Sequence, residues 1–184
     1  AQRPGPATGL PTRTEQGDLQ LAVHAGHGEF PRVIYAPGTL QEGFFLAKRS
    51  FDLADRYQIP VILLSDQYFV DSKYQTSSFL ELGKKPNHHI VRTTESYERY
   101  ANDISGVSPR GIPGYGSGYV CVDSDEHDEA GRITESSEVR KQMVEKRLRK
   151  MQQIRKQSIL PTLYGSAQYE TLLIGWGSTV HNIE

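Results

Sequence analysis

The sequence VIYAPGTLQEGFFLAKRSFDLADRYQIPVILLSD at residues 33–66 decides the fold. It begins with a short apolar run at 33–36 and ends with another at 61–64, and each run has the composition of a buried strand. Between them, Thr39 and Glu42 have the spacing of a capping box. The helix that follows has one apolar face, made of Leu40, Phe44, Ala47, Phe51 and Ala54. Strand, helix and strand in this order predict a βαβ unit with a parallel sheet, and therefore an α/β fold.

Asp66 comes directly after the second predicted strand. Open α/β sheets bind their ligands beyond the carboxyl ends of the strands, so this position makes Asp66 a candidate ligand-binding residue. An aspartate there is equally suited to cap the segment that follows, 67–78. Both interpretations stay open from the sequence.

Composition sets the class of protein. The chain has 184 residues, 36% of them hydrophobic, which suits one globular domain and part of another. Its 21 lysines and arginines against 22 acids favour neither a nucleic acid nor a membrane as partner. The single cysteine, Cys121, excludes a disulfide framework and a cysteine-bound cluster within this chain and fits a reducing compartment. No apolar run reaches the roughly 20 residues of a membrane helix, so we expect a soluble cytoplasmic protein.

The segments on either side of residues 33–66 differ in composition and in the structure they predict. A helix is predicted at 14–23 with Thr14 as its cap, and residues 82–119 are an irregular Gly- and Pro-rich connection. Residues 136–157 predict a long basic helix, mostly solvated, with a narrow apolar stripe of Val139, Met143, Leu148, Met151 and Ile154. An apolar strand at 169–174 and the beginning of a helix at 179–184 predict the start of a second α/β domain.

Three motifs fail as generic catalytic or metal sites. The glycine-rich run 111–118 lacks the lysine of a phosphate-binding loop and is expected to form turns. Residues 123–128 start like a calcium loop but have Asp128 where that loop needs glycine. His24 and His27 have no glutamate beside them and lack the spacing of a zinc protease motif.

The loop from Gln2 to Asp18 is the best candidate site. It contains Arg3 and Arg13, several prolines and glycines, and the threonine hydroxyls of 8, 12 and 14. Guanidinium groups bind carboxylates and phosphates through paired hydrogen bonds, and hydroxyls add further donors. From the residues alone, an ordinary surface loop with exposed arginines is favoured, and an anion site is the functional alternative.

This loop also carries a resemblance. The stretches GPATGLPTRTEQGDL (5–19), HGEFPRVIYAPG (27–38), PVILLSDQY (60–68) and EHDEAGR (126–132) resemble, in order, motifs of the alpha subunit of 2-oxoacid:ferredoxin oxidoreductases. LLIGWGST at 172–179 is similar to the start of the next domain of that subunit. The resemblance implies the later part of a pyrimidine-type thiamine-diphosphate domain at 1–82, a linking excursion and basic helix at 83–168, and the start of a transketolase C-terminal-like domain at 169–184.

The family's chemistry implies roles for the loop. Arg3 would bind the carboxylate of the 2-oxoacid, with Thr12 beside the same substrate, for CoA-dependent oxidative decarboxylation to acyl-CoA and CO2. Thiamine diphosphate would lie at the interface with a beta subunit, which would hold Mg2+ and an iron–sulfur cluster and pass electrons to ferredoxin. The resemblance therefore implies a hetero-oligomeric enzyme of anaerobic metabolism. Pyruvate, 2-oxoglutarate, branched-chain and aryl oxoacids all remain open as substrates.

One departure from the family concerns the segment before Ala1. The family domain carries there a YPITPST-type motif and the glutamate that activates the aminopyrimidine, and neither Glu15 nor Glu42 stands in a context to replace it. We therefore expect a fragment of the alpha subunit that is inactive alone. Two alternatives stay open: a non-catalytic interaction module of the same fold, and a subunit of another thiamine-diphosphate enzyme.

Overall fold

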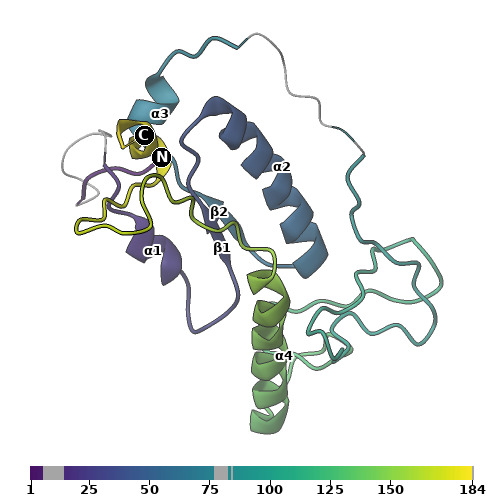
Figure 1. Cartoon of the computed structure of the whole chain (residues 1–184). Helices are drawn as coiled ribbons and strands as arrows, with labels where there is room; N and C mark the ends of the chain where they lie inside the picture. The colour runs from purple at the N-terminus through teal and green to yellow at the C-terminus, as the bar shows by residue number, and fades with distance from the viewer. Residues whose placement is uncertain (6–14, 77–82, 84, 184) are drawn as a thin grey trace.

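The structure is a computed structural model that describes residues 1–5, 15–76, 83 and 85–183. Figure 1 shows a two-stranded sheet with α2 beside it, α4 extending away from it, and both chain ends close to α3. In chain order the elements are α1 (Leu19–Val23), β1 (Val33–Tyr35), α2 (Leu40–Tyr57), β2 (Val61–Leu63), α3 (Gln67–Asp71), α4 (Ser137–Arg155) and the 3-10 helix η1 (Gly177–Asn182).

The predicted βαβ unit is confirmed. β1 and β2 pair in parallel, with Val33 opposite Val61 and Tyr35 opposite Leu63. The Leu64 amide donates to the Tyr35 carbonyl at 2.8 Å and extends the ladder toward the carboxyl edge of the sheet. Both strands therefore end at the same edge.

The predicted capping box is also present at the start of α2. Thr39 Oγ1 accepts from the Glu42 amide at 3.0 Å, and Glu42 Oε2 accepts in return from the Thr39 amide at 3.3 Å. These bonds satisfy amides that a helix start leaves unpaired. The helix ends at Gln58, which has a left-handed conformation with a φ of 52°.

The predicted apolar face of α2 is wrong. Leu40 and Phe44 are exposed and Phe51 is 74% exposed, whereas the buried residues are Leu46, Ser50, Leu53 and Tyr57. This second stripe has the same helical spacing, but Ser50 interrupts its apolar character in the sequence. Ser50 Oγ donates to the Leu46 carbonyl at 2.7 Å, so its hydroxyl is buried with a partner inside its own helix.

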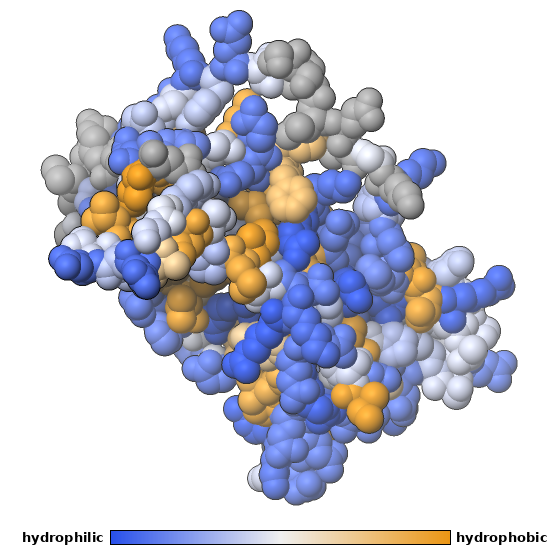
Figure 2. Space-filling view, viewed as in Figure 1, coloured by the Kyte–Doolittle hydropathy of each residue, from blue (hydrophilic) through white to orange (hydrophobic). Residues whose placement is uncertain are grey.

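The core lies between α2, the sheet and the last turns of α4. Leu53, Tyr57, Ile59 and Ile154 form the buried cluster, against which Met151 and residues of both strands pack. The basic helix is thus solvated only in part. Figure 2 shows that its surface on the side facing the viewer is mainly hydrophilic. Its predicted stripe is partly wrong: Met143 and Ile154 are buried, but Leu148 is 42% exposed and Lys146 is buried instead.

The irregular connection predicted at 82–119 is found over its described residues, and it continues to residue 135. The described part contains isolated bridges, including Ile90 with Arg110 and Thr93 with Gly116, and no regular helix or strand. The glycine-rich run 111–118 does more than turn the chain. A side chain at Gly116 or Gly118 would overlap the backbone of Thr93 or Thr94, so these glycines let two segments of backbone touch.

The two ends of the chain depart from the predicted elements. α1 begins at Leu19 after Asp18, which makes no side-chain cap bond, and Thr14 lies outside the described residues. The predicted strand at 169–174 is wrong, because these residues are exposed and irregular. Among the described residues they have no neighbouring strand to pair with, and an unpaired strand is not stable in water. The helix predicted from Thr179 is the 3-10 helix η1.

Among the described helices, none has the length and apolar character needed to cross a membrane.

Candidate functional site at the carboxyl edge of the sheet

Asp66 is the centre of the carboxyl edge. Its side chain is buried, with only 2% of the residue exposed, and one oxygen accepts from the Phe69 amide at 2.9 Å and caps α3. The other oxygen accepts from Ser178 Oγ at 2.5 Å and from Gln16 Nε2 at 3.3 Å. The capping role that the sequence allowed is thus present, together with two contacts that it did not predict.

The start of the chain is fixed beside Asp66. The Gln2 amide donates to the Ser65 carbonyl at 2.5 Å, and the buried Gln2 side chain accepts from the Asp18 amide at 3.1 Å. Arg3 follows directly and is exposed, so its side chain starts from an anchored backbone at the ligand-binding edge. Thr12 and Arg13 lie outside the described residues.

The turn at residues 175–178 closes the edge from the other side. Gly177 is buried with a φ of 59°, a left-handed conformation that favours glycine, and its neighbour Trp176 accepts from Gln16 Nε2 at 3.0 Å. A side chain at Gly38 would come within 2.6 Å of the Gly177 carbonyl oxygen. Glycine at 38 therefore permits the contact between the end of β1 and this turn.

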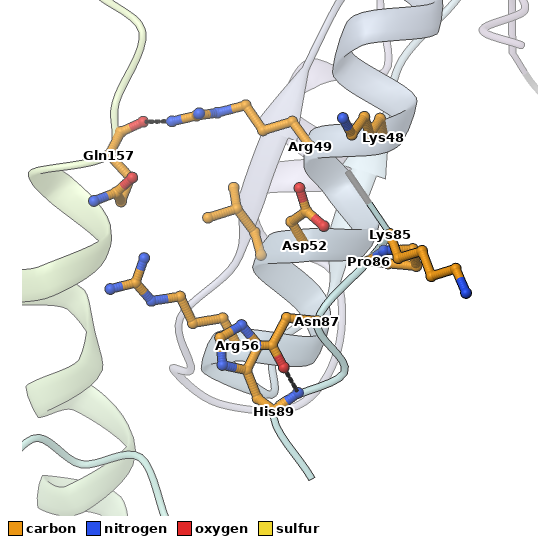
Figure 3. Close-up of a pocket in the computed structure, with 10 residues that line it drawn as sticks. Lys48, Arg49, Asp52, Arg56, Lys85, Pro86, Asn87, His89 and Gln157 are labelled. Carbon is orange, nitrogen blue, oxygen red and sulfur yellow. Dashed lines mark hydrogen bonds between the residues drawn. The ribbon is translucent and has the colours of Figure 1, made fainter. Parts of the chain in front are cut away.

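Away from the carboxyl edge, a hollow of about 370 Å3 lies between α2, residues 85–89 and the end of α4 (Figure 3). Its charged lining mixes Lys48, Arg49, Arg56 and Lys85 with Asp52. Arg49 donates to Tyr35 Oη at 3.0 Å and to the Gln157 carbonyl at 2.5 Å. These bonds engage Arg49 in joining β1 and α2 to the end of α4, so we assign the hollow no ligand.

Ion pairs attach the excursion to the helices. Burial favours a raised pKa for Asp55, but hydrogen bonds from His88 and Arg110 outweigh it and hold the pKa below its usual range. Glu126 behaves in the same way, because burial opposes ionisation while the paired hydrogen bonds from Arg147, at 2.9 and 3.1 Å, lower its pKa. These ion pairs account for the lowered pKa values of Asp55 and Glu126, so the shifts do not indicate a catalytic role for either residue.

The buried Lys146 and the half-buried Lys150 of α4 complete this attachment. Lys146 donates to the Tyr100 carbonyl and Lys150 to the Gln58 carbonyl at 3.3 Å. Burial, followed by repulsion from neighbouring cations, lowers the pKa of each to about 8. Both bonds hold α4 in place, and neither lies at the carboxyl edge of the sheet.

A parallel βαβ unit whose polar loop is anchored at the carboxyl edge defines an α/β ligand-binding domain. The family model described as "Pyruvate flavodoxin/ferredoxin oxidoreductase, thiamine diP-bdg" matches residues 1–146. The chain belongs to this family. The predicted family and the predicted α/β thiamine-diphosphate-binding fold are confirmed by this match.

Curated relatives agree. Subunit alpha of 2-oxoacid:ferredoxin oxidoreductase 1 from Sulfurisphaera tokodaii is 39% identical over 96% of this chain and 29% of its own length. 2-Oxoglutarate oxidoreductase subunit KorA from Mycobacterium tuberculosis is 32% identical over 97% of this chain and 28% of its own length. The chain thus spans less than a third of the length of these relatives.

A solved structure is also similar. It is 2-oxoglutarate:ferredoxin oxidoreductase from Magnetococcus marinus with 2-oxoglutarate, coenzyme A and succinyl-CoA bound. The TM-score is 0.72 at 28% identity, over 99% of this chain and 32% of that chain.

Gln2, Gln16 and Ser178 are the site residues that the sequence analysis missed. Glutamine and serine have no distinctive spacing here, and the only signal was the glycine on either side of Trp176. Gln16 and Ser178 contact Asp66 from 50 and 112 residues away in the chain, and no local sequence pattern indicates contacts at such separations.

Proposed function

We propose that this chain is part of the alpha subunit of a 2-oxoacid:ferredoxin oxidoreductase. In this role it binds the 2-oxoacid for CoA-dependent oxidative decarboxylation to acyl-CoA and CO2, with electrons passed to ferredoxin. Family membership and the names of the relatives support the reaction class. The similar structure from Magnetococcus marinus, which has 2-oxoglutarate and coenzyme A bound, supports the substrate class.

The observation that carries the proposal is the anchored position of Arg3. Gln2, held by Ser65 and Asp18, fixes the backbone from which the exposed arginine extends at the carboxyl edge. A guanidinium can bind a carboxylate through two parallel hydrogen bonds, which orients a 2-oxoacid without donating a proton to it. In the proposal Thr12 lies beside the same substrate.

Among the described residues, no three His, Cys, Asp or Glu side chains come together as metal ligands. Both oxygens of Asp66, the buried carboxylate at this edge, accept hydrogen bonds from protein groups. The proposal follows the family resemblance for the cofactors: thiamine diphosphate is held mainly by a beta subunit, which also carries Mg2+ and an iron–sulfur cluster.

The proposal has further parts that concern the whole enzyme. It describes a cytoplasmic hetero-oligomer of anaerobic metabolism whose partners are the beta subunit and ferredoxin. It keeps the division into 1–82, 83–168 and 169–184, with a transketolase C-terminal-like domain starting in the last range. Pyruvate and 2-oxoglutarate are the first substrates to test, because both occur in the names of the family or its members.

The test uses the full-length alpha subunit co-expressed with its beta partner. The complex is assayed with a panel of 2-oxoacids, CoA and a viologen acceptor, and its thiamine diphosphate content is measured separately. We expect Arg3→Ala to lower kcat/KM for the 2-oxoacid about 100-fold or more without changing cofactor content, because a positioned charge pair is lost. Arg3→Lys keeps the charge but not the paired geometry and should recover only part of the activity.

Arg92→Ala is the matched control, since Arg92 is an exposed arginine of the excursion. Unchanged kinetics for Arg3→Ala would refute the substrate assignment. A complex without any CoA-dependent reduction of viologen would favour the non-catalytic module or another thiamine-diphosphate enzyme.

A further inference from the structure

Three segments that are far apart in the chain meet at Asp66. Ser178 lies 112 residues after it and Gln16 lies 50 residues before it, and both donate hydrogen bonds to the same carboxylate oxygen. Gln16 also donates to the Trp176 carbonyl at 3.0 Å. We name Asp66, Gln16 and Ser178 the Asp66 clasp.

The chemistry of the clasp is that of a buried anion with several donors. A carboxylate oxygen accepts more than one hydrogen bond, and bonds to a charged acceptor are stronger than neutral ones. The Gln16 amide nitrogen carries two hydrogens, and both have acceptors here: the Asp66 oxygen and the Trp176 carbonyl. Loss of the Asp66 charge would weaken the hydrogen bonds of both donors.

The clasp lies beside the bond that anchors the backbone before Arg3. The Ser65 carbonyl holds Gln2, immediately before Arg3, and the adjacent Asp66 holds Gln16, near the end of the same loop. Two residues after Gln16, the Asp18 amide donates to the Gln2 side chain at 3.1 Å, so Gln2 and Gln16 are held together at the carboxyl edge of β2. A backbone that is held before the ligand arrives loses less conformational entropy on binding.

We propose that Asp66 is a positioning residue that holds Gln16 against the turn at 175–178, and through Gln16 holds the backbone that leads into Arg3, and so sets the affinity of the enzyme for its 2-oxoacid. This inference rests on the proposed function, because it assigns Asp66 a role through Arg3. In this proposal Asp66 acts through Gln16 and the nearby bond between Asp18 and Gln2, and does not touch the substrate.

The decisive variant is Asp66→Asn in the full-length alpha subunit with its beta partner. Asparagine remains a good helix cap, so α3 is preserved, but the side chain loses its charge and half of its acceptor capacity. We expect KM for the 2-oxoacid to rise about tenfold or more, as the loss of bonds to a charged group implies, with kcat and thiamine diphosphate content nearly unchanged.

Asp71→Asn is the matched control. It makes the same substitution in the same helix, at an exposed carboxylate whose partner is Gln67 of α3. It should leave KM and kcat as in the wild type. Ser178→Ala removes one donor and should raise KM less than Asp66→Asn, and the double variant should be no worse than Asp66→Asn alone.

The outcomes separate this inference from the proposed function. If Arg3→Ala has no effect, the substrate assignment itself fails. If Arg3→Ala abolishes turnover while Asp66→Asn behaves like Asp71→Asn, or loses thermal stability with KM unchanged, the positioning role is overturned. If Asp66→Asn does not fold, Ser178→Ala decides, because a KM equal to that of the wild type contradicts the proposal.

Discussion

Ile154→Ala tests the finding that the basic helix α4 contributes to the core. Ile154 is 5% exposed and lies in the cluster of Leu53, Tyr57 and Ile59, whereas Leu148 of the same helix is 42% exposed. Truncation of a buried isoleucine removes apolar burial and leaves a cavity, at a cost of about 2–5 kcal/mol. The same truncation at Leu148 should cost about 1 kcal/mol or less, since little apolar area is lost there.

Hydrogen exchange of the full-length subunit measures this difference locally. At about 1.4 kcal/mol for each factor of ten, Ile154→Ala should speed the exchange of core amides by about 30-fold or more. The faster exchange should appear in β1 and the last turns of α2 as well as in α4, because the side chains of all three pack together. Equal effects from Ile154→Ala and Leu148→Ala, or effects confined to α4, would refute the packing described for this helix.

Two further perturbations test the helix start and the buried lysines. Thr39→Ala removes the acceptor of the Glu42 amide and should lower the opening free energy of the first turn of α2 by about 1 kcal/mol, seen as faster exchange there; an exposed Thr171→Ala serves as control. Burial lowers the pKa of Lys146 and Lys150 to about 8, while an unfolded lysine keeps its proton to about pH 10.4. Between these values the unfolded state binds more protons, so the thermal midpoint should rise with pH from about 8 to about 10. The rise should disappear in the Lys146→Met/Lys150→Met variant and persist in Lys141→Met, and an equal slope in both variants would contradict it.

Local patterns predicted the part of the fold that local interactions determine. The capping box of Thr39 and Glu42 joins residues that are neighbours in the chain, and the two strand runs are continuous and apolar. The buried face of α2 was not predictable in this way, because the helix carries two stripes of similar spacing. Which stripe is buried depends on packing against Ile154, which lies about a hundred residues away in the chain.

The candidate site shows the same limit. Arg3 and Asp66 could be singled out because of their chemistry and their position beside a loop or a strand end. Gln16 and Ser178 could not, because each acts only through a contact with Asp66 that forms in three dimensions. Lys146 was counted as one cation of a solvated helix, although its aliphatic stem and its bond to the Tyr100 carbonyl place it inside.

The Asp66 clasp also sets an order of assembly during protein synthesis. The pairing of β1 with β2 and the cap of α2 use contacts within residues 33–63 and can form early, whereas the buried cluster of α2 also needs Ile154. Asp66 must wait for Ser178, which is 112 residues later. At about 5–20 residues per second, translation of this interval takes about 6–22 s. During that time the carboxyl edge of the sheet lacks the bond from Ser178 to Asp66 and is open to chaperones and proteases.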